Sequence, residues 1–254
     1  MPRYFIHFAY DGTRYHGWQI QPTANTVQQE LQTGLSTILR TPVETTGAGR
    51  TDTGVHARHM VAHFDVSEML DEGQLAYRLN RILPRDIAVY RIEKVADDMH
   101  ARFSATSRTY HYYLHTEKNP FLRATSCELH YPLDFNLMNE AAEHLLHVRD
   151  FAAFCKSHTD VKTTICRVDE ARWIKDSPTQ WHFRITADRF LRNMVRAVVG
   201  TLIDVGRQRI TIKEFDAIVE GKKRTEAGES MPAHALFLEC VGYDGKPAGK
   251  ECRE

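Results

Sequence analysis

The sequence predicts an α+β protein built from two halves, with a largely antiparallel mixed sheet and flanking helices. Short runs with the two-residue alternation of strands are interleaved with longer runs that have helical spacing. This order occurs twice, and no linker composition separates the two halves. A chain of 254 residues is also long enough for two small domains, which commonly hold about 100–200 residues each.

The first half contains five predicted elements before residue 105. Its opening run is aromatic and β-rich, and it stops at the turn pair Asp11 and Gly12. Thr26 is placed to cap a helix, because Gln29 follows in capping-box position and apolar residues then recur at helical spacing. The predicted elements are strands at residues 4–10, 60–66 and 87–95 and helices at residues 26–39 and 75–83.

The second half repeats this alternation from residue 106 onward. Two apolar runs around the Ser177-Pro178 turn should pair, and residues 189–205 show the clearest helical spacing in the chain. The predicted elements are strands at residues 109–115, 164–174, 180–187 and 235–243 and helices at residues 136–148 and 189–205. Mixed β-α-β-β order is typical of ferredoxin-like or RNA-recognition-like halves. We therefore expect an N-terminal half at residues 1–105 packed against a C-terminal half at residues 106–254.

The composition is that of an ordinary soluble globular protein, with 42% hydrophobic and 26% charged residues. The N-terminus lacks the apolar region of a signal peptide, and no run approaches the ~18 apolar residues of a membrane span. The five cysteines are irregularly spaced without a CxxC pair, which suggests neither a zinc ribbon nor a disulfide framework. We therefore expect a cytoplasmic protein that makes no membrane contact.

The formal net charge of zero argues against a protein that grips nucleic acid over its whole surface. The charges are unevenly distributed, however. Between Arg189 and Arg224 the sequence contains nine Lys and Arg residues but only four acidic residues. This local excess predicts either a groove for a phosphate backbone or a solvated helix face, and charge alone favours neither.

A glycine-rich segment at Gly47–Gly54 is too polar for a regular element and should form a loop. Its three glycines allow a tight turn and the close approach of a ligand. Arg50 and Asp52 would then be exposed on a rigid scaffold, where catalytic groups are often found. The alternative is a plain tight turn in which Asp52 caps its own backbone. No Gly-Lys-Ser/Thr follows, so the segment is not a phosphate-binding loop.

The string GRTDTGVHA at residues 49–57 resembles the signature of the tRNA pseudouridine synthase A family. Three further stretches resemble the family in the expected order: YDGTRYHGWQ at residues 10–19, SRTYHY at 107–112 and FLRNMVRAVVG at 190–200. The resemblance covers nearly the whole chain. It implies an isomerase that breaks the N-glycosidic bond of uridine and reattaches the base through carbon, at positions 38 to 40 of the tRNA anticodon arm.

The same resemblance implies roles for individual residues around a catalytic cleft between the halves. Asp52 would be the nucleophile, and Arg196 would pair with it, since a cation within ~4–6 Å keeps a desolvated carboxylate ionised. Tyr110 matches the active-site tyrosine, whose ring could stack on a flipped base. Arg50 would hold the RNA with its base extruded, and Arg192 is a possible RNA contact.

Helix geometry leaves an alternative for Arg196. On a helix over residues 189–205, one face would carry Arg189, Arg192, Asn193 and Arg196, opposite Leu191, Met194, Val198 and Leu202. Arg196 could then belong to an exposed basic face. Tyr110 could likewise be an ordinary half-buried strand residue, and Arg50 a plain surface arginine.

Three histidines, His56, His59 and His63, invite a metal-binding interpretation. Their segment alternates like a strand, however, which would place His56 on the opposite face from the other two, so we expect no metal and no cofactor. The family resemblance also implies a homodimer that binds tRNA. The competing functions are a catalytically inert tandem RNA-binding protein and a hydrolase that uses Asp52 on a small nucleoside. An intact Asp52, Arg196 and Tyr110 set argues against the inert binder.

Overall fold

The computed structural model describes residues 1–156 and 162–243, which form nine strands and five α-helices. These residues fall into two compact units. Unit 1 holds residues 1–106 and the closing strand from Phe237 onward, and unit 2 holds residues 107–236. The chain therefore leaves unit 1 after Thr106 and returns to it at Phe237.

The sheet of unit 1 is built around β1 (Arg3–Tyr10), a strand whose residues are mostly buried. β1 pairs antiparallel with both β3 (His56–Asp65) and β4 (Ile87–Val95). The short β2 (Thr46–Gly47) pairs antiparallel with β3, whereas β9 (Leu236–Tyr243) runs parallel to it. These strands carry the segments on either side of the glycine-rich loop.

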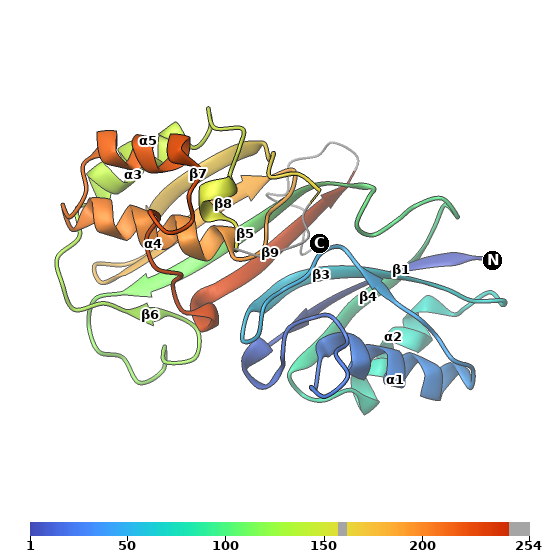
Figure 1. The fold of residues 1–254 in the computed structure, drawn as a ribbon. Helices are drawn as coiled ribbons and strands as arrows, with labels where there is room; N and C mark the ends of the chain where they lie inside the picture. The colour runs from blue at the N-terminus through green and yellow to red at the C-terminus, as the bar shows by residue number, and fades with distance from the viewer. Residues whose placement is uncertain (157–161, 244–254) are drawn as a thin grey trace. The chain divides into compact units, whose positions relative to one another are not determined.

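Two helices, α1 (Val27–Leu39) and α2 (Glu72–Ile82), lie on the same side of this sheet (Figure 1). Thr26 caps α1 by accepting the Gln29 N–H, and Asp71 caps α2 in the same way. The helices pack against each other, and the apolar stripe of α1 faces the core, where Leu31 and Leu35 are fully buried.

The sheet of unit 2 has β8 (Gln180–Ala187) at its centre. This strand pairs antiparallel with β5 (Ala105–His115) and β7 (Val168–Lys175), and the short β6 (Cys127–Glu128) runs parallel to β5. Alternate residues of β8 are buried, including Phe183. The side chains on one face of this sheet therefore belong to the hydrophobic core of unit 2.

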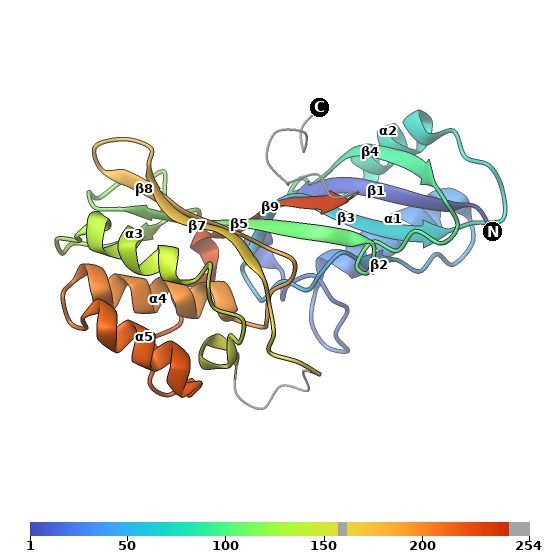
Figure 2. The same ribbon diagram turned by 90° about the horizontal axis from the view of Figure 1, so that it is seen from above.

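Three helices gather on that face of unit 2 (Figure 2). α3 (Phe135–His144) packs against β7, and both α4 (Met194–Gly206) and α5 (Ile212–Gly221) pack against α3. The Phe135 ring stacks on Trp181 of β8 with 3.7 Å between the ring centroids.

The predicted α+β class with a largely antiparallel mixed sheet is confirmed, since only the β3–β9 and β5–β6 pairs are parallel among the pairs within each unit. The helix α5 was not predicted. Across residues 1–156 and 162–243, no helix is long and apolar enough to cross a membrane. Among the described residues, Cys127, Cys155 and Cys166 are buried thiols that form no disulfide.

Candidate active site

The loop between β2 and β3 carries Asp52 in a tight turn, residues 51–55, which we call the aspartate turn. Asp52 is half-buried and Arg50 is exposed, so both side chains reach the surface of unit 1. The Val55 N–H closes the turn by donating to the Asp52 carbonyl at 3.1 Å. Gly54 has a φ of +78°, a left-handed conformation that glycine adopts at little cost. The glycine-rich segment thus presents a carboxylate on a defined backbone.

The loop that follows β1 packs directly against the aspartate turn. The Gly54 N–H donates to the Tyr15 carbonyl at 3.2 Å, and the Tyr10 hydroxyl lies 2.8 Å from Thr51 Oγ1. Gly17 has a φ of +84°, and a Cβ built on it would lie only 2.2 Å from the Thr51 carbonyl oxygen. Because no side chain fits there, Gly17 allows two backbones to touch and fixes the turn from behind.

Trp18 contacts the start of the glycine-rich loop, and His56 holds its end in place. His56 Nδ1 accepts the Gly12 N–H at 3.0 Å, and the imidazole stacks on Phe237 of β9 with 4.4 Å between centroids. The Trp18 ring lies against Gly47, where a Cβ would come within 2.6 Å of the indole. The motif at residues 10–19 therefore supports the signature loop structurally.

Tyr110 lies on β5 of unit 2, on the strand face that the helices cover. It pairs in register with the buried Ile185, and its ring meets the Phe190 ring edge-on, with 5.1 Å between centroids and an angle of 85°. Tyr110 is half-buried, whereas Tyr112, two residues further along the same face, is fully buried. Part of the Tyr110 ring is therefore accessible, as stacking on a base requires.

The helix that carries Arg196 begins later than the sequence predicts. α4 starts at Met194, and the preceding Asn193 has a left-handed φ of +67°. Asparagine tolerates this conformation better than most residues, so the chain can turn sharply into the helix here. Arg189 and Arg192 therefore precede the helix, and the predicted helical face that they would share with Arg196 is wrong.

Arg196 is half-buried on a helix that is otherwise almost wholly buried, with Asp204 as the other partly exposed position of α4. Its Nε donates to the Met231 carbonyl at 2.5 Å, and the Met231 N–H donates to the Arg196 carbonyl at 3.2 Å. Burial raises the pKa of the Tyr112 phenol well above its usual range, and the nearby Arg196 guanidinium opposes that rise. Because Arg196 is half-buried and hydrogen-bonded to the Met231 carbonyl, it does not belong to an exposed basic face.

A pair of glycines holds the Met231 segment against α4. A Cβ built on Gly200 would lie 1.9 Å from the Glu229 carbonyl oxygen, and one on Gly228 would lie 2.7 Å from the Gly200 carbonyl carbon. The Gly228 N–H also donates to Thr201 Oγ1 at 2.9 Å. This close backbone approach positions the carbonyl that holds the arginine. Sequence reasoning missed Gly228, because it lies in a separate loop without a local signal.

The two predicted RNA contacts, Arg50 and Arg192, are both exposed, one in each unit. Arg192 lies in the turn before α4, and its carbonyl accepts the Lys156 N–H at 3.1 Å. Within unit 2 the structure therefore gathers Tyr110 and Arg196 on one side of β5, with Arg192 in the turn that leads into the same helix.

The basic stretch from Arg189 to Arg224 runs through the turn before α4, through α4 and through α5. Several of its cations are engaged. Arg207 lies over the Tyr131 ring at 3.8 Å, and ion pairs of 2.9–3.5 Å join Lys222 to Asp150, Lys223 to Glu226 and Arg209 to Asp204. Paired charges add less to a long-range field, so the stretch is a weaker phosphate groove than its charge count predicts.

The three histidines of β3 contact different partners. His56 meets the loop before α1, whereas His59 Nε2 lies 2.9 Å from His7 Nδ1 and His63 Nδ1 accepts the Ala101 N–H at 3.1 Å. The strand geometry thus sends them to separate places. In the described ranges, no group of three or more potential metal ligands occurs.

Comparison with known proteins gives a consistent result along the chain. A family model described as tRNA pseudouridine synthase matches residues 6–104 and 141–244. The chain is 54% identical to tRNA pseudouridine synthase A of Bacteroides fragilis, with 95% of this chain and 96% of the relative covered. It is 55% identical to the protein of that name from Bacteroides thetaiotaomicron (96% and 91% covered) and 39% identical to that of Bacillus subtilis (93% and 97% covered). The chain therefore belongs to the tRNA pseudouridine synthase family.

Proposed function

We propose that this protein isomerises uridine to pseudouridine at positions 38–40 of the tRNA anticodon arm, with Asp52 as the nucleophile. Membership of the family makes the protein an isomerase that acts on tRNA. The observation that supports the nucleophile best is the aspartate turn, a half-buried carboxylate on a backbone fixed by Gly17 and Gly54. A group held in this way is oriented before the substrate arrives, which nucleophilic catalysis requires.

The reaction needs a carboxylate because one bond must be broken and remade without releasing the base. The C1′–N1 bond of uridine breaks, uracil turns, and its C5 atom becomes attached to C1′. C5 gives up a proton and N1 gains one, so the atoms balance without a co-reactant or a cofactor. Asp52 acts at this glycosidic centre and retains the detached uracil for the second bond.

Arg196 and Tyr110 act on the same uridine as Asp52. A guanidinium favours the ionised form of a carboxylate even where the pocket excludes water. The bond from Arg196 to the Met231 carbonyl fixes the direction of this cation. The partly exposed Tyr110 ring stacks on the extruded base, a contact worth ~1–3 kcal/mol, and its hydroxyl moves a proton as the product regains aromaticity.

Arg50 and Arg192 contact the RNA, and the protein works as a cytoplasmic homodimer. Both arginines are exposed, as phosphate contacts must be. The net charge of zero leaves each copy little basic surface for a long anticodon arm, and a second copy adds its own field. Light scattering at working concentration should show a dimer. A fully active monomer would refute the proposal that two copies bind one tRNA together.

The decisive experiment is incubation of the purified protein with unmodified tRNA, followed by digestion and nucleoside analysis. Pseudouridine mapped to positions 38–40 is the expected result. Free uracil would indicate a hydrolase, and tRNA that is bound but unchanged would indicate an inert RNA-binding protein. Pseudouridine at other positions would support the isomerase activity but would refute positions 38–40 as its target.

A further inference from the structure

The loop between β5 and β6 carries the most exposed apolar ring of unit 2. Phe121 is 90% exposed, and no role described above uses it. Single exposed apolar residues are common on protein surfaces, so exposure alone indicates nothing. What distinguishes Phe121 is the way its loop is built.

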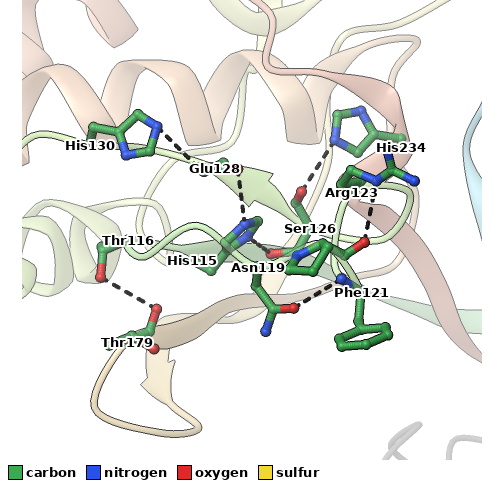
Figure 3. A network of polar contacts seen from close by, with 11 residues as sticks. His115, Thr116, Asn119, Phe121, Arg123, Ser126, Glu128, His130, Thr179 and His234 are labelled. Atoms are coloured by element: carbon green, nitrogen blue, oxygen red, sulfur yellow. Dashed lines mark hydrogen bonds and ion pairs between the residues drawn. The ribbon is translucent and has the colours of Figure 1, made fainter.

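The loop is held rigid by hydrogen bonds on both sides of Phe121 (Figure 3). The Phe121 N–H donates to Asn119 Oδ1 at 2.9 Å, and Arg123 Nε donates to the Pro120 carbonyl at 3.3 Å. The Ser126 N–H donates to the Leu122 carbonyl at 2.9 Å. Figure 3 shows the Phe121 ring pointing away from this network. Because these bonds hold the backbone around Phe121, the loop itself loses little conformational freedom when the ring binds.

The base of the loop is anchored to the segment that holds Arg196. The Ser126 side chain is hydrogen-bonded at 2.9 Å to His115, a residue only 1% exposed at the end of β5. His234 Nε2 lies 3.3 Å from the Ser126 carbonyl, and three residues before His234 is the Met231 whose carbonyl binds Arg196. Phe121 is therefore fixed relative to the proposed catalytic arginine within the same unit.

Phe103 of unit 1 is another exposed phenylalanine, and it differs from Phe121 in having aromatic and cationic neighbours. Phe103 is 75% exposed, but His100 packs on it at 4.3 Å and the Arg102 guanidinium lies 5.6 Å from its centroid. In the described part of the chain, no ring or cation stacks on Phe121 in this way. Phe103 thus already has an aromatic and a cationic neighbour, whereas the described residues place neither against the Phe121 ring.

Two cations lie close to Phe121 in the sequence of this loop. Lys118 and Arg123 lie three residues before and two residues after Phe121, and neither forms an ion pair with any carboxylate in residues 1–156 and 162–243. An exposed aromatic ring in a loop that also carries cations is a combination that binds single-stranded nucleic acid, with stacking on bases and attraction to phosphates.

We propose that Phe121 stacks on an unpaired base of the tRNA while Arg123 contacts a neighbouring phosphate. This inference rests on the proposed function, because it needs tRNA as the ligand. It assigns the loop of residues 116–126 to substrate positioning, outside the chemistry performed by Asp52, Tyr110 and Arg196.

The test measures binding of fluorescently labelled unmodified tRNA by anisotropy, in a background of Asp52→Asn so that no turnover occurs. Phe121→Ala should weaken binding roughly 5- to 150-fold, the range of one lost base stack. Phe121→Trp should keep the affinity, and Phe121→Leu should not, since leucine is apolar but has no flat ring. Phe103→Ala is the matched control and should leave the affinity unchanged.

Salt titration distinguishes the stacking contact of Phe121 from the phosphate contact of Arg123. Arg123→Gln should reduce the slope of log K against log salt by about 0.7, the contribution of one phosphate of a single strand, whereas Phe121→Ala should leave the slope unchanged. Equal affinity for wild type and Phe121→Ala would overturn the proposal. Conversion of a dimer to a monomer by Phe121→Ala, seen by light scattering, would also overturn it by showing that the ring meets a second copy. A wild-type protein that binds tRNA but forms no pseudouridine would refute the proposed function separately.

Discussion

The aspartate turn of unit 1 and the Arg196 site of unit 2 position their charged groups by different means. In unit 1 two loops touch backbone to backbone through Gly17, and local turn geometry does the rest. In unit 2 a buried helix carries the arginine, and the Gly200–Gly228 contact brings a distant carbonyl to it. The carboxylate therefore depends on neighbouring loops, whereas the cation depends on packing of the helical core.

The largest expected effect comes from Asp52→Asn, which should lower turnover by at least about 1000-fold, as loss of a nucleophile does. The amide has nearly the same shape, so tRNA affinity and melting temperature should stay close to wild type. Pseudouridine formation under single-turnover conditions measures the loss. Thr53→Ala, an exposed change in the same turn, is the control and should remain active. Substantial turnover by the Asn variant would remove Asp52 from the chemistry.

Arg196→Met should lower activity by roughly 100-fold or more and should also lower the melting temperature. The bond from its charged Nε to the Met231 carbonyl is lost, and such bonds are worth about 1.5–3 kcal/mol. Arg196→Lys keeps the charge but not the planar fork, so it should recover part of the activity and little of the stability. Kinetics and melting temperature both equal to wild type would show that the arginine serves neither role.

Tyr110→Phe and Tyr110→Ala separate the two roles of this ring. The Phe variant keeps the ring and its contact with Phe190, so it should bind tRNA normally, and its turnover should fall by about 100-fold or more if the hydroxyl transfers a proton. The Ala variant should in addition bind less tightly. If both variants bind and react alike, stacking is not the role of Tyr110.

Gly17→Ala tests the backbone contact behind the aspartate turn. A Cβ at Gly17 meets the Thr51 carbonyl oxygen and is strained by the positive φ, so we expect a loss of about 2–4 kcal/mol in the free energy of unfolding. Gly49→Ala is the matched control in the same region, because a Cβ there meets nothing within 4 Å. Urea unfolding measures both, and equal stabilities would disprove the close approach.

Mild acid should destabilise unit 1 through its buried histidines. Burial lowers the pKa of His59 to about 3 and that of His63 to about 4, below the ordinary value of 6.5. The unfolded chain therefore binds more protons, and stability that is present above pH 6.5 is lost as the pH falls toward 4. Each histidine should cost about 2 kcal/mol between pH 7 and pH 5, measured by urea unfolding.

A matched variant checks the origin of this acid sensitivity. His63→Gln keeps an acceptor for the Ala101 N–H but does not titrate, so it should remove about half of the pH dependence. Trp18 reports on unit 1, and Trp173 reports on unit 2. An unchanged pH dependence in the variant would exclude His63 as a source.

The sequence predicts the aspartate turn because its determinants are contiguous: three glycines, the carboxylate and the strand that follows. It does not predict the setting of Arg196, because periodicity alone does not reveal the left-handed Asn193 or the contact with Gly228. The missed helix α5 had a signal, the capping box formed by Thr211 and Glu214. That signal lies inside the basic stretch, where charged residues interrupt the apolar spacing of the helix.

The return of the chain to unit 1 through β9 has a consequence for synthesis on the ribosome. Unit 2 is complete once residue 236 has emerged, whereas β3 gains its parallel neighbour only after the last strand appears. At about 5–20 residues per second, the nascent N-terminal unit must wait on the order of 10 s for that strand. During this interval the edge of β3 next to the aspartate turn is an open pairing site, and a chaperone or the growing unit itself must keep it from associating with another chain.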